Sequence, residues 1–272
     1  MILVTGATGN VGRHAVSQLT AAGAQVRALV RNPAKAAFPA GVEVVTGDLT
    51  DPASLSGALD GVDGVFLVWP GFAAETAAKV VDLVAAHARR VVYLSANLPE
   101  DSTMFHKDLE RLISASPLEW TFLRPGGFAA NTLGWADAVR AGTVRWVYGQ
   151  AARSLIHEAD IAAVAVKALL SDELVGQAPV LSGPAAVTQA EQVRIIGAAV
   201  GREVRWEEMP PEEAVTQLAT VWGDPVLARE AVAAWGGFVA APEQVTDAVE
   251  RLTGRPARSF AAWAADHAAD FR

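Results

Sequence analysis

Residues 1–12 read MILVTGATGNVG, and this stretch decides the fold. A short apolar run from Ile2 to Val4 is followed by glycines at positions 6, 9 and 12, and then by an amphipathic pattern of helical period. At this spacing Gly6 permits a tight turn, Gly9 lets backbone N–H groups approach a phosphate, and Gly12 lets the helix pack closely on the strand. The N-terminus of that helix then faces an anion, so the stretch predicts a dinucleotide-binding turn. The residues expected to contact the dinucleotide here are Gly6, Thr8, Gly9, Asn10, Val11 and Gly12.

Apolar runs bounded by Gly, Asp and Asn recur along the first half of the chain, and longer stretches of helical character separate them. These runs cover residues 2–4, 25–30, 42–45, 65–68, 91–94 and 120–123, with a further candidate at 179–182. Continuous Val, Ile and Leu runs joined by helical connections are typical of a parallel sheet covered on both faces. The sequence therefore predicts an α/β fold, a doubly wound parallel sheet of the Rossmann type.

The pattern changes after residue 126 and becomes mainly helical after Ser182. It predicts helices over residues 132–140 and 160–170, and Thr188 with Glu191 has the spacing of a capping box that opens another helix. We predict two domains. Residues 1–126 with about 150–183 form the dinucleotide-binding domain, and residues 127–149 with 184–272 form a small, mainly helical C-terminal lobe on the substrate side.

The residue after the second predicted strand distinguishes the two nicotinamide dinucleotides. An acidic side chain there binds a ribose 2′-hydroxyl, whereas an arginine accommodates a 2′-phosphate. This chain carries Arg31, followed by Asn32 and then Lys35, and it has no carboxylate in this stretch that would repel a phosphate. The alternative is a solvent-exposed arginine at a strand end. We expect these three residues to favour NADP(H) over NAD(H).

Two further strand ends are expected at the cofactor. Asp48 follows the third predicted strand, where its carboxylate has the chemistry to accept from an adenine amino group while Leu49 packs on the ring. The alternative for Asp48 is a turn or helix-capping aspartate. Val68, Trp69 and Pro70 end the fourth predicted strand and are expected to border the cofactor or substrate, because open α/β sheets bind ligands at such carboxyl ends.

Composition excludes several classes of protein. The 272 residues include no cysteine and carry a net charge of −8, so thiol chemistry, disulfides and a basic stripe for nucleic acid are not expected. No stretch approaches the ~20 apolar residues of a membrane span, and we expect a cytoplasmic protein without a membrane partner. His157, Glu158 and Asp160 are of metal-binding types, but the two carboxylates point to different faces at helical spacing, so no metal is predicted.

Several stretches together resemble one family. They are residues 4–12, 30–33, 47–49, 106–110, 121–126 with Phe128 and Asn131, and 253–260. Over nearly its whole length the chain resembles the NmrA-like group of atypical short-chain dehydrogenases, which includes NADPH-dependent quinone reductases and cofactor-sensing regulators. The resemblance implies an extended Rossmann fold with a small C-terminal lobe, and side chains of Phe128 and Asn131 turned toward substrate.

The chain departs from ordinary short-chain dehydrogenases in its catalytic residues. Those enzymes use a tyrosine as general acid, with a lysine four residues later and a serine nearby. The two tyrosines here are Tyr93 and Tyr148, and the lysine position after them holds Asn97 and Ala152. We therefore expect a reductase without the usual Tyr-Lys pair.

Ser95, His106 and Lys107 are the candidate catalytic residues. Ser95 closes the fifth predicted strand, and His106 is the only imidazole near the expected nicotinamide, with a side chain type that titrates near neutral pH. His106 or Lys107 is the candidate proton donor, and Lys107 is also expected at the nicotinamide ribose. The alternatives are a packing histidine and a solvated helix lysine.

Aromatic side chains in the second half suit a flat apolar substrate. We predict an NADPH-dependent reductase that transfers a hydride to a quinone or to a carbonyl, enone or imine, as a monomer or homodimer. The alternative is a non-catalytic NADP(H)-sensing regulator that binds a protein partner. The predicted substrate contacts are Trp69, Phe128, Asn131, Trp135, Tyr148 and Trp222, with Trp146 and Trp235 also available.

Overall fold

The chain divides into two compact units in the computed structural model, which describes residues 1–71 and 74–272. The first unit comprises Met1–Pro125, Glu158–Leu181 and Ala248–Arg255, and the second comprises Gly126–His157, Ser182–Asp247 and Pro256–Arg272. Two segments differ from the predicted domains. Residues 150–157 belong to the second unit because strand β8 (Ala152–Arg153) pairs there with β10 (Val187–Thr188). Ala248–Arg255 belongs to the first unit because helix α9 (Ala248–Thr253) packs on α5 (Glu158–Leu170).

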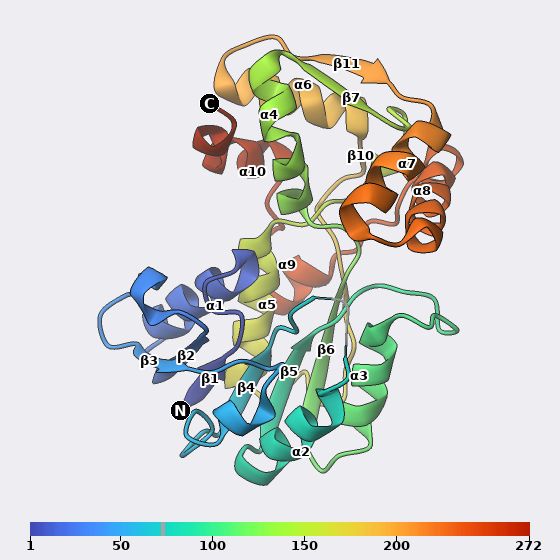
Figure 1. Cartoon of the computed structure of the whole chain (residues 1–272). Coiled ribbons are helices and arrows are strands. Elements are labelled where there is room, and N and C mark those ends of the chain that lie inside the picture. Colours follow the sequence, from blue (N-terminus) through green and yellow to red (C-terminus); the bar gives the residue numbers. More distant parts are fainter. Residues whose placement is uncertain (72–73) are drawn as a thin grey trace. The chain divides into compact units, whose positions relative to one another are not determined.

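The first unit is built on a parallel sheet of seven strands in the order β3-β2-β1-β4-β5-β6-β9 (Figure 1). The chain runs from β1 to one edge and then returns to β4, so the winding direction reverses between β1 and β4. The predicted doubly wound Rossmann fold is therefore confirmed. The strands are β1 (Ile2–Val4), β2 (Val26–Val30), β3 (Glu43–Thr46), β4 (Gly64–Leu67), β5 (Arg90–Leu94), β6 (Glu119–Pro125) and β9 (Val180–Leu181).

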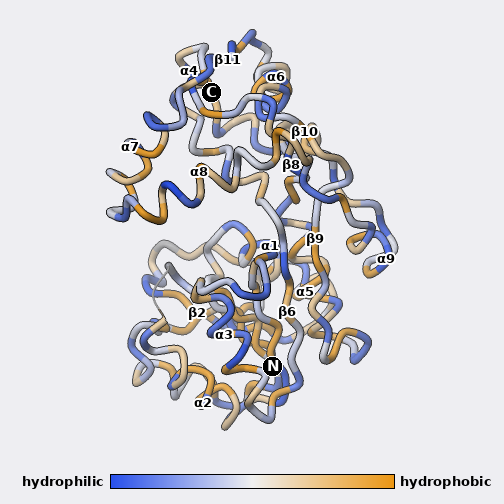
Figure 2. The backbone as a smooth tube through the Cα atoms, turned by 90° about the vertical axis from the view of Figure 1, so that its right-hand side faces the viewer, coloured by the Kyte–Doolittle hydropathy of each residue, from blue (hydrophilic) through white to orange (hydrophobic). Residues whose placement is uncertain are grey.

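Helices cover both faces of this sheet. Helix α1 (Asn10–Ala21) packs beside α5, whereas α2 (Ala77–His87) packs beside α3 (Phe105–Ser114) on the other face (Figure 1). Strands β1, β2 and β4 are buried at every position, as expected for a sheet covered on both sides. Helix α3 is strongly amphipathic, and its hydrophilic segments are blue in Figure 2. Short 3-10 turns, η1 (Pro33–Lys35) and η2 (Pro52–Leu55), follow β2 and β3.

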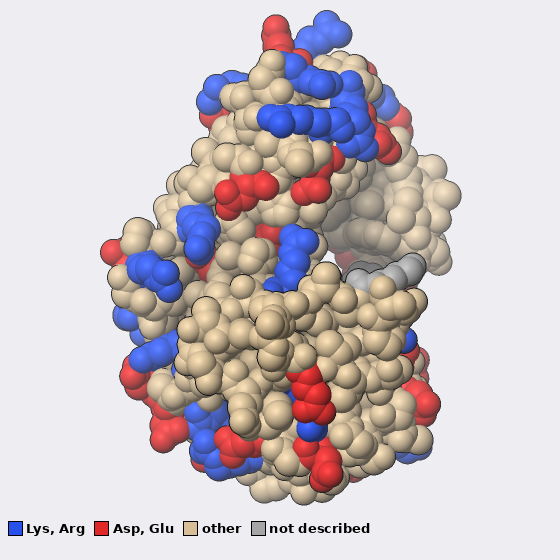
Figure 3. All heavy atoms as spheres, turned by 90° about the vertical axis from the view of Figure 1, so that its left-hand side faces the viewer, with Lys and Arg blue, Asp and Glu red and all other residues tan. Residues whose placement is uncertain are grey.

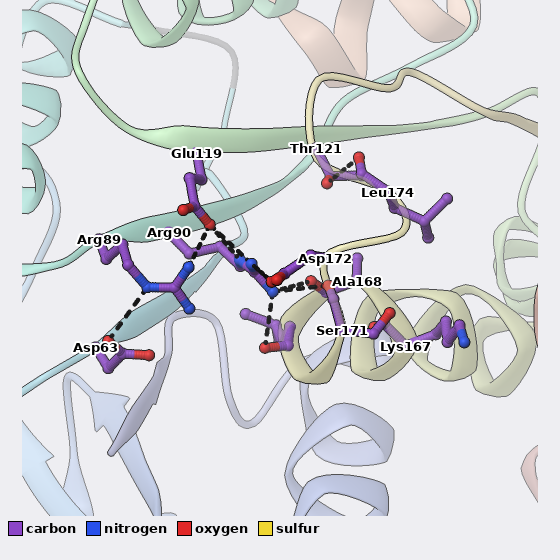
Figure 4. A network of polar contacts seen from close by, with 11 residues as sticks. Asp63, Arg89, Arg90, Glu119, Thr121, Lys167, Ala168, Ser171, Asp172 and Leu174 are labelled. Carbon is purple, nitrogen blue, oxygen red and sulfur yellow. Dashed lines mark hydrogen bonds and ion pairs between the residues drawn. The ribbon is translucent and has the colours of Figure 1, made fainter.

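Arg90 anchors the end of the sheet opposite the carboxyl ends of the strands (Figure 4). Its side chain is 3% exposed and donates to Glu119 at 2.7 Å and to the Ser171 carbonyl at 2.7 Å, with a further ion pair to Asp172. It also donates to the Ala168 carbonyl near the C-terminus of α5, where a cation complements the helix dipole. This network holds the helix end against β5.

The second unit is mainly helical, as predicted. Two short strand pairs accompany its helices: β8 with β10, antiparallel, and β7 (Thr143–Trp146) with β11 (Arg205–Glu208), parallel. Thr188 caps α6 by accepting from the Glu191 N–H at 3.2 Å, but the Glu191 carboxylate binds Arg194 instead of completing a capping box. The helices are η3 (Ala129–Trp135), α4 (Ala136–Ala141), α6 (Gln189–Val200), α7 (Pro211–Trp222), α8 (Pro225–Ala240), α10 (Phe260–Asp266) and η4 (Ala268–Phe271).

The surface carries charges of both signs. Lys and Arg side chains lie beside Asp and Glu side chains on the face drawn in Figure 3. Among the helices of residues 1–71 and 74–272, none has both the length and the apolar character that crossing a membrane requires. Within the same residues, no three His, Asp or Glu side chains are grouped so that they would hold a metal ion.

Candidate functional site

The turn between β1 and α1 is shaped by its glycines. Gly6 has a φ of +57°, a conformation that side chains with a Cβ rarely adopt. A Cβ on Gly12 would lie 2.1 Å from the carbonyl oxygen of Gly6 and 2.8 Å from its carbonyl carbon. We predicted that Gly12 allows the helix to pack closely on the strand. The atoms nearest to a Cβ at position 12 belong to Gly6 and Ala7, in the turn that follows the strand. The helix N-terminus is thereby held directly over the Gly6 carbonyl.

The N-terminus of α1 has no side-chain cap. Gly9 is the N-cap residue, and its own N–H donates to the Gly6 carbonyl at 2.9 Å. The backbone N–H groups of Asn10, Val11 and Gly12 follow in the first turn, which holds no acidic side chain. Unpaired N–H groups and the positive end of the helix dipole attract anions. The first turn of α1 therefore presents backbone N–H groups that are available to an anion, as expected from a glycine at position 9.

Thr5 holds the strand ends in register beside this turn, a role that sequence reasoning missed. Its buried hydroxyl accepts from the Val68 N–H at 2.7 Å and donates to the Val68 carbonyl at 3.0 Å. These contacts join the end of β1 to the residue after β4. Because Val68 also lies 3.0 Å from where a Gly6 Cβ would be, the three residues form one compact corner.

A cavity of about 240 Å³ opens at the carboxyl ends of β1, β2, β3 and β4. It includes eight of the predicted cofactor residues, namely Gly6, Thr8, Gly9, Arg31, Asp48, Leu49, Val68 and Trp69. Pro70, which ends the same predicted strand as Trp69, also lines it as expected, whereas sequence reasoning missed Thr5, Leu29, Val30 and Gly47. Asn10, Val11, Gly12, Asn32 and Lys107 do not line it, and the side chain of Lys35 lies outside the described part of the structure. The cavity therefore joins the glycine turn to the strand end that carries Arg31.

Arg31 and Asn32 have different surroundings at this strand end. The Arg31 side chain is exposed and forms no ion pair or hydrogen bond with the described residues, so its guanidinium is available to a ligand. The Asn32 side-chain oxygen instead accepts from the Ala34 N–H at 3.1 Å and caps η1. Asn32 thus fixes the backbone that follows Arg31.

Asp48 forms a turn as well as lining the cavity. Its Oδ1 accepts from the backbone N–H of Thr50 at 2.9 Å and from the Thr50 hydroxyl at 2.8 Å. These hydrogen bonds lower the pKa of Asp48 against the opposing effect of burial, and the nearby Arg31 charge adds to the decrease. Asp48 therefore forms the turn that we considered as its alternative role, and this turn also keeps its carboxylate at the cavity wall.

Glu110 is the centre of a second group of polar residues, at the end of β5 and the start of α3. The Ser95 hydroxyl donates to Glu110 Oε1 at 2.7 Å. Arg124 donates to Oε1 at 2.8 Å and to Oε2 at 2.6 Å. Burial raises the pKa of Glu110, but the Arg124 and Ser95 hydrogen bonds outweigh it and the net direction is down. Ser95 is thus held by a buried carboxylate that sequence reasoning overlooked inside the His106 helix.

Lys107 is buried on the same face of α3. Its Nζ lies 3.7 Å from Glu110 Oε2 and 3.4 Å from Glu100 Oε2, and no described residue accepts a hydrogen bond from it. The alternative of a solvated helix lysine is therefore wrong. A buried ammonium with unused donors is suited to bind an oxygen atom of a ligand.

His106 and Tyr93 are both unsuited to proton donation. Burial lowers the pKa of His106 to about 4, although the Glu110 charge opposes the decrease, and the imidazole is neutral at pH 7. The expected titration near neutral pH is therefore wrong. The His106 ring lies 3.9 Å from the Phe105 ring, centroid to centroid. Tyr93 is fully buried, and burial together with the Glu110 charge raises the pKa of its phenol far above the usual range.

The second unit has its own cavity, of about 420 Å³. Three indole rings line it, those of Trp135, Trp146 and Trp235, and Asn131 also lines it. Phe128, Tyr148 and Trp222 were predicted as substrate contacts but pack among the apolar clusters of this unit instead, and Trp69 lines the first cavity. Residues missed by sequence reasoning include Thr132, Arg153, Leu155, Gln189 and Gln192, which become neighbours only through the tertiary fold.

The comparisons with known proteins identify the family. A family model described as NAD(P)H-binding matches residues 6–172. The chain belongs to this NAD(P)H-binding family. This match, together with the relatives described next, confirms three predictions. They are the resemblance to the NmrA-like short-chain dehydrogenases, a nicotinamide dinucleotide as cofactor, and an NAD(P)H-dependent oxidoreductase activity.

Two relatives that are named as reductases align with this chain along its whole length. A reductase of Streptomyces griseus, named for (4-alkanoyl-5-oxo-2,5-dihydrofuran-3-yl)methyl phosphate, is 40% identical and covers 100% of this chain and 99% of its own. An NAD(P)H azoreductase of Xenophilus azovorans is 36% identical over 100% of this chain and 99% of its own. The structure of an Escherichia coli NADPH-dependent quinone oxidoreductase with NADPH has a TM-score of 0.80 and 25% identity, covering 98% of this chain and 99% of that one.

The residues of this family member fit the dinucleotide. A Cβ on Gly12 would collide with the backbone of Gly6 and Ala7, so only glycine there lets the first turn of α1 pack against the glycine turn. That turn has no side-chain cap and no acidic residue, which suits a pyrophosphate. Leu49 and Trp69 contribute apolar surface to the same cavity, which suits an adenine ring.

Proposed function

We propose that the chain is an NADPH-dependent reductase that transfers a hydride to a flat, apolar acceptor, a quinone or a conjugated carbonyl, enone or imine, without a Tyr-Lys pair. The observation that carries the preference for NADPH is the free, exposed guanidinium of Arg31 at the wall of the glycine-turn cavity. A guanidinium binds a phosphate through a planar fork of donors, whereas a ribose hydroxyl gains little from it.

The acceptor class is supported by the aromatic cavity of the second unit. Indole rings offer large apolar faces to a planar molecule, and Trp135, Trp146 and Trp235 all line this cavity. Two relatives agree with this class, since one is named as an azoreductase and another, from Escherichia coli, as a quinone oxidoreductase. An azo compound and a quinone are both flat, conjugated and uncharged at their reacting atoms.

The chemistry requires little from a proton donor. Reduced nicotinamide supplies the hydride when it is bound. A quinone that accepts it becomes a stabilised oxygen anion, so a strong general acid beside it is unnecessary. His106 is neutral at pH 7, and Arg124 is engaged by Glu110, which leaves Lys107 as the charged side chain of this group without a hydrogen-bond acceptor among the described residues. We assign Lys107 to bind an oxygen of the ligand and Glu110 to hold Ser95 and Arg124 beside it.

Calorimetric titration with NADPH and NADH, followed by the absorbance of reduced nicotinamide with a panel of quinones, enones and imines, tests this proposal. We expect NADPH to bind at least about tenfold more tightly than NADH, about 1.4 kcal/mol, and to be oxidised by at least one quinone. Tight binding with no oxidation by any acceptor in the panel would favour a cofactor-sensing regulator instead.

A further inference from the structure

Arg153 lines the aromatic cavity of the second unit and forms a part-buried ion pair with Glu243. Arg153 donates from Nε to Glu243 Oε2 at 3.0 Å and from Nη2 to Oε1 at 3.2 Å, so the two side chains meet fork to fork. Both are largely removed from solvent, with side-chain exposures of 19% and 10%. The Glu243 carboxylate also accepts from the Ser154 N–H at 2.9 Å, which fixes its position.

Two consecutive glycines make room for this pair. A Cβ on Gly126 would lie 2.5 Å from Glu243 Oε1, and a Cβ on Gly127 would lie 2.7 Å from Arg153 Nη2. Contacts this short do not occur in proteins, so any other residue at either position would displace the pair. Both glycines line the same cavity. Glu243 therefore lies directly behind the part of the cavity wall that Gly126, Gly127 and Arg153 form.

The guanidinium of Arg153 has one nitrogen left for a ligand. Glu243 occupies Nε and Nη2, and the ring of Phe238 lies 4.5 Å from the guanidinium carbon and covers one face. No described residue accepts a hydrogen bond from Nη1. Arg153 Nη1 can therefore donate hydrogen bonds into the cavity. The ion pair as a whole carries no net charge, because the Glu243 carboxylate balances the Arg153 guanidinium.

We propose that Arg153 and Glu243 determine the substrate class of this reductase: Arg153 Nη1 donates to the carbonyl oxygen of an uncharged acceptor, and Glu243 excludes acceptors that carry an anionic group. This inference rests on the proposed function, because it places the acceptor in the same aromatic cavity. A neutral carbonyl oxygen needs a donor and no counter-charge. An anion would gain little from a neutralised guanidinium and would be repelled by a carboxylate one hydrogen bond away.

The neighbouring polar groups agree with an uncharged ligand. Gln189 and Gln192 line the cavity, and each donates its side-chain N–H to a backbone carbonyl, those of Val147 and Val187, at 2.9 and 2.8 Å. Gln189 uses its second N–H on the Tyr148 carbonyl at 3.2 Å, so its amide oxygen is the atom left over, whereas Gln192 keeps its amide oxygen and one N–H. Carbonyl-type oxygens disfavour a bound anion.

The test measures binding in the absence of cofactor, by calorimetry, with a naphthoquinone and its ring sulfonate as the two probes. For the wild-type chain we expect the uncharged quinone to bind at least about tenfold more tightly than the sulfonate, about 1.4 kcal/mol. Glu243→Gln keeps the acceptor for the Ser154 N–H but removes the charge, and we expect it to shift that ratio about tenfold toward the sulfonate. Arg153→Met keeps apolar contact with Phe238, and we expect it to weaken the uncharged quinone about five- to tenfold.

The control is Glu191→Gln. Glu191 forms a similar fork with Arg194, at 2.7 and 2.6 Å, on the exposed surface of α6 and outside the cavity lining. The ratio of the two affinities should not change in this variant. An unchanged ratio in Glu243→Gln, or undiminished quinone binding in Arg153→Met, would overturn the inference.

The two proposals fail separately. If the wild type binds the probes in the expected ratio but does not oxidise NADPH, the charge selection is correct and the reductase function is wrong. If the chain reduces quinones but the ratio is the same in Glu243→Gln, the reductase function is correct and the charge selection is wrong.

Discussion

Replacing Gly12 by alanine should damage cofactor binding far more than its size suggests. The added Cβ would lie 2.1 Å from the Gly6 oxygen, whereas ordinary contacts begin near 3.4 Å, so turn and helix must separate by about 1.3 Å. The obstructing atoms belong to the backbone of Gly6 and Ala7, which no rotamer change can move away. Such overpacking costs about 1–3 kcal/mol of stability, of which alanine's better helix propensity returns up to about 1 kcal/mol.

The loss of affinity follows from the same displacement. A hydrogen bond of about 2.9 Å that is lengthened by more than 1 Å is lost, and each charge-assisted bond contributes about 1.5–3 kcal/mol. Losing one or two such bonds from the first turn of α1 weakens NADPH binding about a hundredfold. Calorimetry measures the affinity and urea unfolding measures the stability.

Gly57→Ala is the matched control, because a Cβ on Gly57 would meet nothing within 4 Å. It should leave NADPH affinity unchanged and stability within about 0.5 kcal/mol of wild type. If Gly12→Ala bound NADPH as tightly as wild type, the assignment of the pyrophosphate to this helix N-terminus would be refuted.

Three other variants test separate parts of the structure. Arg31→Ala should weaken NADPH about ten- to a hundredfold and leave NADH nearly unchanged by calorimetry, and an equal loss for both cofactors would contradict the 2′-phosphate assignment. The folded-state pKa of His106, about 4, lies below its unfolded value near 6.5, so the unfolded chain takes up the proton first and stability falls as pH drops from about 6.5 toward 4. His106→Gln should lose less stability than wild type between pH 7 and 5 in urea unfolding, and an equal loss in both proteins would count against the buried neutral imidazole. Arg90→Met should destabilise the first unit by about 2–4 kcal/mol, because Glu119 and the carbonyls at the end of α5 lose their cation, while NADPH affinity below the melting transition stays unchanged. A melting temperature equal to that of wild type would show that the network of Figure 4 contributes little.

The fold of the first unit was predictable because its signals are local. Each buried strand is a short apolar run, and the turn at Gly6 is recognisable from spacing between neighbours in the sequence. The strand-end residues Arg31, Asp48, Leu49, Val68 and Trp69 of the cavity at the glycine turn followed from one rule, that parallel strands present their carboxyl ends at the same edge. Arg31 and Trp69 could therefore be placed at one site although 38 positions separate their numbers.

The protonation states and most of the polar lining of the second cavity were not predictable, because they depend on tertiary packing, although Asn131 and Trp135 were named in advance. His106 was expected to titrate near neutral pH, and only its burial among other residues of the first unit shows that it does not. Glu110 is an ordinary helix residue in the sequence and becomes central when β6 brings Arg124 to it. Arg153 and Glu243 are 90 positions apart, and no motif joins them. Tyr148 and Trp222 were assigned to substrate by residue type, although the apolar interior of the lobe uses the same types.

The most direct test of the central claim is a single turnover with the chain in excess over NADPH. NADPH is bound first, an uncharged quinone is added without oxygen, and the absorbance of the reduced nicotinamide is followed against a sample without protein. We expect complete loss of that absorbance at a rate that saturates with quinone concentration, and a slower loss when NADH replaces NADPH. Bound NADPH that keeps its absorbance with every quinone and enone added would contradict a reductase and identify a protein that only senses the cofactor.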